Sequence, residues 1–156
     1  MFEIKGDTAT FHSDGAYPNN KGWRMNISDI AIIALAFDDV PDFSFKQTIL
    51  FVNKKRQIFK VDINKFKDTN QFDSFWKTVS ERLGIDIDYR REFFPSIVKI
   101  IYPNELHGAR LFQPWSITSW PAITFHFLSH LLSAEKRMLN GEIIPYLNML
   151  REENIS

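Results

Sequence analysis

At 156 residues, with 44% hydrophobic and 15% aromatic positions, the chain can bury one continuous core, which argues against disorder and for a single domain over residues 1–156. Its 19 basic and 19 acidic residues cancel, which excludes the overall positive charge with which general nucleic-acid binders attract phosphates. The absence of cysteine excludes a disulfide framework, a thiolate metal site and a nucleophilic thiol, and it favours a reducing cytoplasm.

The N-terminal part of the chain is predicted to form strands. Residues 2–12 predict two short strands joined by a turn at Gly6-Asp7, because these residue types readily adopt the positive φ angles of tight hairpins. A polar loop is expected over residues 13–22. The stretch 23–40 is rich in β-branched residues and predicts buried strand, although its apolar positions follow no clean period.

The middle of the chain predicts a hairpin followed by a helix. Strands are expected over 46–52 and 57–63, joined by the basic segment 53–56, because apolar and polar residues alternate in the second strand. An amphipathic helix is predicted over 69–83. Its apolar side chains follow the spacing of one buried stripe, and Gly84 marks its end; the stripe comprises Phe72, Phe75, Trp76, Val79 and Leu83.

The C-terminal third predicts two short strands, over 97–102 and 106–112, and then two helices. The first helix is expected from Ser119 to about residue 139, and the second carries Pro145 near its start. Strands gather in the first two-thirds and helices follow, which is typical of the α+β class. We therefore expect a mostly antiparallel sheet, with the helix over 69–83 and the two C-terminal helices packed on it.

Two histidines with helical spacing are the strongest metal candidates. His126 and His130 lie at i and i+4 of a predicted helix, a spacing at which two imidazoles can share a zinc ion. Phe127, however, stands where metalloproteases place a glutamate, and both histidines also fall on the polar stripe of that helix. The six glycines are scattered, so no phosphate-binding loop is predicted. We therefore predict no metal, no cofactor and no catalytic residues.

Three segments are candidates for contact with a partner, and each also has an ordinary structural interpretation. The acidic turn with Asp38, Asp39 and Asp42 would suit a basic partner, or it is a solubilising turn. The basic hairpin around Lys54, Lys55 and Arg56 lies in a stretch, 46–67, whose only acidic residue is Asp62. It would suit phosphates or an acidic partner, or it is a solvated face.

The third segment is aromatic and runs over residues 110–120. Arg110, Trp115 and Trp120 are residue types that dominate interface hot spots, although they serve equally well in a core. Pro114 interrupts the segment, so a regular helix or strand is not expected there.

The sequence favours a binding function over catalysis. The most concrete hypothesis is a bacterial immunity protein that neutralises a cognate toxin, of a contact-dependent or other polymorphic system, by occluding its active site. The alternatives are a lipid- or nucleic-acid-binding module that uses the basic hairpin over 54–60, and a small His-dependent enzyme. No signal peptide is evident, and the longest apolar run, residues 30–37, is far shorter than the about 20 residues of a membrane span, so membrane insertion is not expected.

Overall fold

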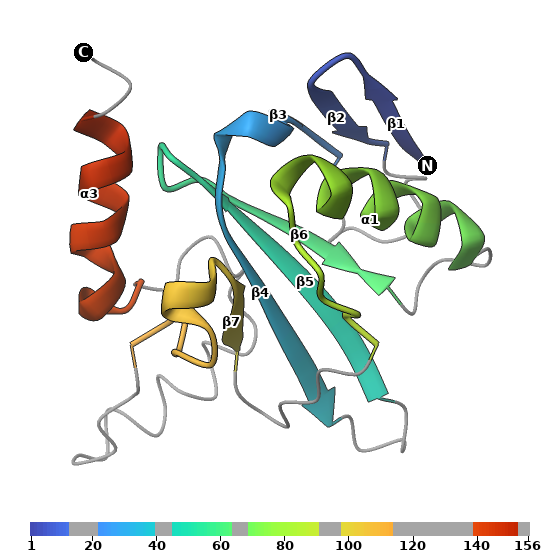
Figure 1. Ribbon diagram of the computed structural model, residues 1–156. Coiled ribbons are helices and arrows are strands. Elements are labelled where there is room, and N and C mark those ends of the chain that lie inside the picture. Colours follow the sequence, from blue (N-terminus) through green and yellow to red (C-terminus); the bar gives the residue numbers. More distant parts are fainter. Residues whose placement is uncertain (13–21, 40–44, 64–68, 91–97, 114–138, 153–156) are drawn as a thin grey trace.

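The described residues form two antiparallel sheets and two α-helices (Figure 1). The structure is a computed structural model, and it describes residues 1–12, 22–39, 45–63, 69–90, 98–113 and 139–152. The α+β class is therefore confirmed. The prediction of one sheet is wrong, because the described strands divide into a three-stranded and a four-stranded sheet.

The smaller sheet has the order β1-β2-β3, from β1 (Phe2–Lys5), β2 (Thr8–Phe11) and β3 (Trp23–Asn26). The predicted hairpin over 2–12 is confirmed: Lys5 pairs with Thr8, and Gly6 takes the positive φ of 56° that the turn requires. β3 adds to the other side of β2, with Ala9 opposite Met25.

The larger sheet has the order β6-β5-β4-β7, from β4 (Ile30–Asp39), β5 (Phe45–Asn53), β6 (Ile58–Asp62) and β7 (Lys99–Tyr102). All its neighbouring strands are antiparallel, and the predicted hairpin is β5–β6. β4 and β5 form the longest ladder, from Ile30 opposite Asn53 to Asp39 opposite Phe45.

The predicted strand over 23–40 is in fact two strands in different sheets. A 3-10 turn, Ile27–Asp29, separates β3 from β4. The turn is held by Asp7, whose backbone oxygen accepts from the Ile27 N–H at 2.9 Å and whose carboxylate accepts from the Ser28 hydroxyl at 2.5 Å. Asp7 lies in the first hairpin, 21 residues before Ser28 in the chain. The break between the two strands therefore depends on a distant residue, and the local sequence of 23–40 does not predict it.

β4 has no clean hydrophobic period because both of its faces are buried. Ile33 and Leu35 point to one side of the sheet, while Ile32 and Ala34 point to the other. The register against β5 also shifts between Ile30 and Ile32, which interrupts the alternation.

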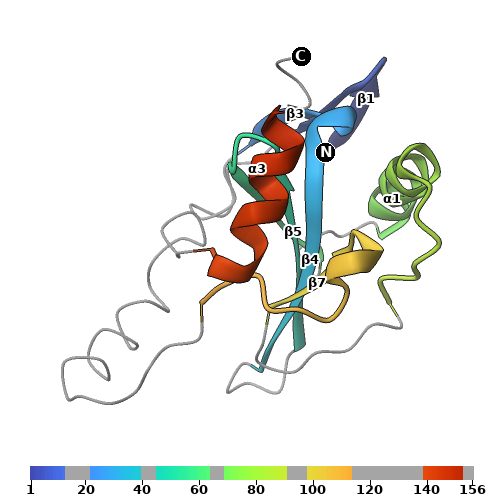
Figure 2. The same cartoon turned by 60° about the vertical axis from the view of Figure 1, so that its left-hand side comes forward.

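The two helices cover opposite faces of the four-stranded sheet (Figure 2). α1 (Thr69–Leu83), which has the predicted bounds, packs with the small sheet over one face. The aromatic core there includes Phe51, Phe72, Phe75, Trp76 and Tyr89. α3 (Ile144–Glu152) covers the other face over an aliphatic core with Leu50, Val52, Ile100, Leu111 and Leu147.

The second short strand predicted over 106–112 is not formed. A 3-10 turn, Asn104–Leu106, and Gly108, with φ of 80°, reverse the chain instead, leaving only single bridges from Arg110 to Lys99 and from Phe112 to Leu139. The helix predicted from Ser119 lies outside the described residues apart from its expected end. There, Leu139 bridges Phe112 and is not helical.

The last predicted helix is α3, and Pro145 lies in its first turn, as expected. A 3-10 turn, Gly141–Ile143, precedes it, and the Asn140 side chain accepts a hydrogen bond from the Glu142 N–H at its start. Of the helices in the described ranges, none combines the length and hydrophobicity that crossing a bilayer would require.

Candidate functional site

The β5–β6 connection carries the predicted basic residues and forms a tightly hydrogen-bonded turn. Residues Lys54, Lys55 and Arg56 are called the basic tip below. At its base, the Asn53 N–H donates to the Gln57 carbonyl at 3.0 Å. The Asn53 side-chain amide donates to the Gln57 side-chain oxygen at 2.8 Å, and the Gln57 backbone N–H donates to the Asn53 side-chain oxygen at 2.8 Å. The Arg56 N–H also donates to the Asn53 carbonyl at 2.8 Å, so the backbone of the tip has one defined shape.

Arg56 adopts a conformation that is unusual for its residue type. Its φ is 64°, in the left-handed region, which costs a residue with a side chain about 1 kcal/mol and which glycine adopts readily. Its guanidinium donates a hydrogen bond to the side-chain oxygen of Asn148 on α3. Figures 1 and 2 both show the β5–β6 turn beside this helix. The tip is therefore fixed to a second element of the fold.

The tip presents positive charge to solvent. Lys55 and Arg56 are exposed, and Lys54 is half-buried, with its backbone N–H donating to the Asp29 carbonyl at 2.9 Å. Arg151, also exposed, follows Asn148 by three residues on α3 and so projects from the same side of that helix. The acidic residues Asp29 and Glu152 lie near these cations in the chain or through a backbone contact, as the Lys54–Asp29 bond and the position of Glu152 after Arg151 show.

The aromatic residues of this hairpin, Phe51 and Phe59, belong to the core. Phe51 is fully buried, and Phe59 packs against the aromatic core with its ring 5.6 Å from that of Trp23. These two rings are therefore engaged inside the protein and do not form an exposed platform for stacking bases.

The acidic turn lies at the opposite end of the same ladder. Asp38 is opposite Lys46, whereas the basic tip follows Asn53, which is opposite Ile30. At about 3.4 Å per residue, the two ends are about 25 Å apart. Asp39 ends β4, and Asp42 lies outside the described residues. Asp38 and the basic tip therefore lie at opposite ends of the β4–β5 ladder.

Of the three candidate contact residues in the aromatic segment, Arg110 is the one within the described residues. It is exposed, and its backbone carbonyl accepts from the Asn140 side chain at 3.1 Å. Trp115 and Trp120 lie outside the described residues, so the choice between core and contact surface stays open for them.

The histidine candidates do not converge within the described ranges. His107 is exposed in the turn after residues 104–106, and the His12 ring nitrogen lies 3.6 Å from a Glu3 carboxylate oxygen. His126 and His130 lie outside the described residues. In the part of the chain that the structure describes, no three His, Asp or Glu side chains are grouped so that they could hold a metal ion.

A polar cluster that the sequence did not reveal holds the segment after α1. The Tyr89 hydroxyl donates to an Asp73 carboxylate oxygen at 2.6 Å, and the Arg90 guanidinium pairs with the other oxygen. Burial raises the pKa of Tyr89 to about 12, and the hydrogen bond to Asp73 adds to the rise. The tyrosine therefore stays protonated at neutral pH and acts as a structural donor.

A buried polar pair lies on the α3 side of the larger sheet. Asp62, expected on a polar face, is only 7% exposed, and it accepts a hydrogen bond from the Thr48 hydroxyl at 2.8 Å. The Lys60 ammonium lies 3.2 Å from the same carboxylate oxygen. Both faces of β6 are thus covered, which the alternating sequence pattern did not predict.

Comparison with known proteins adds no identification to this geometry. The chain matches no family of known sequences, no curated protein and no solved structure. The best-defined candidate site is therefore the basic tip, on the grounds of its own geometry and charge.

Proposed function

We propose that this chain is a protein-binding protein whose basic tip docks on an acidic surface of a partner. The observation that carries the proposal is Arg56: an arginine in a left-handed conformation, with its guanidinium tied to Asn148. Strained backbone that the surrounding structure holds in place is typical of functional sites. We infer that the exposed charge held at this position is available to a partner.

The rigidity of the tip favours binding. The hydrogen bonds between Asn53 and Gln57 fix the backbone before a partner arrives, so less conformational entropy is lost on association. Arginine is enriched among interface hot spots, and neighbouring lysines accelerate encounter with a surface of opposite charge. Lys54 and Lys55 fit that supporting part.

A protein partner suits this tip better than nucleic acid or a lipid surface. Those partners offer extended arrays of phosphate and select for broad positive fields, whereas the chain as a whole has no net charge. The tip itself supplies only three basic residues, and the nearby rings of Phe51 and Phe59 are packed inside. A small group of positive charges is better suited to pairing at short range with acidic side chains in a protein cleft.

In its most concrete form, the proposal is an immunity protein of the bacterial cytoplasm that occludes the active site of a cognate toxin. A small cysteine-free α+β protein with a rigid charged projection suits that task, because occlusion needs shape and charge and no chemistry of its own. An acidic toxin surface would receive the basic tip. A basic toxin would instead be received at the acidic turn with Asp38, Asp39 and Asp42.

The test is to identify a toxin domain encoded beside this chain and to measure binding to it and protection from it. We expect tight binding by calorimetry and survival of cells that co-express the two proteins. Arg56→Ala is expected to weaken binding about tenfold or more, while Lys77→Ala, which removes an exposed cation on α1, leaves it unchanged. Absence of both binding and protection would refute the proposal, and steeply salt-dependent binding to oligonucleotides would favour the nucleic-acid alternative.

A further inference from the structure

β1 is an edge strand whose outer side is available for pairing in the described part of the chain. The smaller sheet runs β1-β2-β3, so no described strand pairs with the other side of β1. Met1 and His12 exchange two backbone hydrogen bonds, of 2.8 and 2.9 Å. Hydrogen-bonded and non-hydrogen-bonded pairs alternate in an antiparallel ladder. The Met1–His12 pair is hydrogen-bonded, and the Ile4–Ala9 pair lies three positions further along, so it is a non-hydrogen-bonded pair. The N–H and C=O of Ile4 therefore point away from β2.

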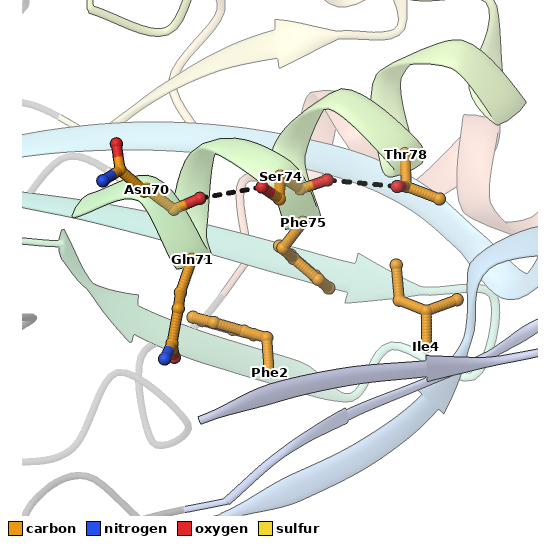
Figure 3. A pocket seen from close by; sticks show the side chains of 7 residues that line it. All are labelled: Phe2, Ile4, Asn70, Gln71, Ser74, Phe75 and Thr78. Atoms are coloured by element: carbon orange, nitrogen blue, oxygen red, sulfur yellow. Dashed lines mark hydrogen bonds between the residues drawn. The ribbon is translucent and has the colours of Figure 1, made fainter. Parts of the chain in front are cut away.

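A groove of about 390 Å³ lies between β1 and the N-terminal half of α1 (Figure 3). The side chains of Phe2 and Ile4 rise from β1 toward the helix and, with Phe75, form its apolar part. The helix contributes polar uncharged side chains, namely Asn70, Gln71, Ser74 and Thr78. The groove therefore offers room for an apolar side chain beside the outer edge of β1.

The opposite face of β1 carries one negative and one positive side chain, Glu3 and Lys5, which would face each other if two copies of β1 paired antiparallel. Glu3 and Lys5 flank Ile4, and their side chains form an ion pair of 2.7 Å. In an antiparallel pair of two copies of β1 with Ile4 opposite Ile4, each Glu3 would lie opposite the second copy's Lys5. Opposite charges at directly facing positions stabilise a strand pair, and like charges destabilise it.

We propose that a second copy of this chain adds to the edge of β1 and joins the two smaller sheets into one continuous sheet. The two Ile4 residues exchange a pair of backbone N–H···O=C bonds, and Glu3 and Lys5 of each copy face Lys5 and Glu3 of the other. Facing residues of an antiparallel pair project to the same side of the sheet. The second copy's Ile4 side chain therefore enters the mouth of the groove, beside Phe2 and below Ser74.

The charges of Glu3 and Lys5 favour a second copy of β1 over an unrelated strand as the pairing partner. Charged side chains on an exposed edge normally discourage pairing with an unrelated strand, because most sequences would place like charges or uncharged residues opposite them. A second copy of β1, running antiparallel, places its Lys5 opposite Glu3 and its Glu3 opposite Lys5, so opposite charges meet at both positions. The inference concerns different residues from those of the basic tip and does not depend on the proposed function.

The test uses two charge reversals that each disrupt the pairing but complement one another. Glu3→Lys places like charges opposite each other at both facing positions, and so does Lys5→Glu. The molar mass of the wild-type chain, measured by sedimentation equilibrium over a range of concentrations, is expected to be that of a dimer. Each single variant is expected to dissociate at about tenfold or more higher concentration.

An equimolar mixture of Glu3→Lys and Lys5→Glu is the decisive experiment, because the lysines of one variant then face the glutamates of the other across the interface. We expect the mixture to regain the wild-type dimer constant, and the double variant, Glu3→Lys with Lys5→Glu, to dimerise alone. Both single variants lack the ion pair within β1, so a mere loss of strand stability would not be repaired by mixing. Lys77→Glu on α1 is the control and is expected to dimerise as the wild type does.

Three outcomes would overturn the proposal. The wild-type chain could be monomeric at every concentration, the single variants could dimerise as well as the wild type, or the mixture could stay monomeric. Melting temperatures of the variants separate loss of dimerisation from loss of folding. In the second outcome, copies would meet through a surface other than β1.

Discussion

Arg56 and Asn148 join the β5–β6 turn to the C-terminal helix by a side-chain hydrogen bond between residues 92 positions apart in the chain. The bond fixes a guanidinium whose backbone already has a left-handed φ of 64°. It therefore connects two parts of the fold at the point where the basic tip is exposed.

The backbone strain at Arg56 can be measured by comparing two substitutions. Arg56→Ala and Arg56→Gly both remove the bond to Asn148, but only glycine relieves the left-handed conformation. We expect the glycine variant to be about 1 kcal/mol more stable than the alanine variant in urea unfolding. Equal stabilities, or a more stable alanine variant, would show that the turn is not strained at this residue.

The buried hydroxyl of Thr48 is expected to stabilise the fold through Asp62. Thr48→Val keeps the shape of the side chain but removes the donor to a carboxylate that is 7% exposed. We expect a loss of about 1–2 kcal/mol in the free energy of unfolding. Thr78→Val is the matched control, because that exposed hydroxyl donates only to the Ser74 carbonyl of its own helix. A loss no larger than that of the control would contradict the assignment.

Phe72 lies at the centre of the aromatic core and is expected to be among its most sensitive positions. Its side chain is fully buried, and its ring lies 5.2 Å from that of Tyr89 and 5.9 Å from that of Phe75. Phe72→Ala should lower the free energy of unfolding by about 3–5 kcal/mol, because it leaves a cavity. Met149→Ala, at a position 50% exposed, should change it by less than about 0.5 kcal/mol.

Tyr89 makes stability depend on pH in the alkaline range. Its pKa is raised from 10 to about 12 in the folded protein, so folding favours the protonated hydroxyl. The resulting stabilisation is complete below pH 10 and is lost as the pH rises through 12. The stability difference between the wild type and Tyr89→Phe should therefore shrink over this interval, as followed by thermal melting. A difference that is constant with pH would argue against the raised pKa of Tyr89 and so against the burial of its hydroxyl.

The elements that sequence reasoning placed correctly are those with strong local signals. The stripe from Phe72 to Leu83 predicted α1, and the Gly6-Asp7 pair predicted the β1–β2 turn. The break between β3 and β4 escaped prediction because it depends on tertiary bonds from Asp7. The absence of a second strand after β7 reflects the turn at Gly108, which the local pattern did not reveal.

The candidate site was predictable in its charge but not in its geometry. Three consecutive basic residues, Lys54, Lys55 and Arg56, stand out in the sequence, so the sequence alone identifies them as a candidate contact site. Its partner Asn148 could not, because nothing local connects residues so far apart. The left-handed φ of Arg56 also lacks a signal, since glycine or asparagine would be expected at such a position. The cluster of Tyr89, Asp73 and Arg90 likewise forms only in the folded chain.

The central claim is that the basic tip is the surface that binds a partner. Its most direct test is a calorimetric titration of the proposed toxin partner with two matched charge reversals, Lys55→Glu on the tip and Lys77→Glu on α1. The account predicts that the first weakens binding by about tenfold or more, and that the second leaves the affinity at the wild-type value. Equal affinities for the two variants would contradict it.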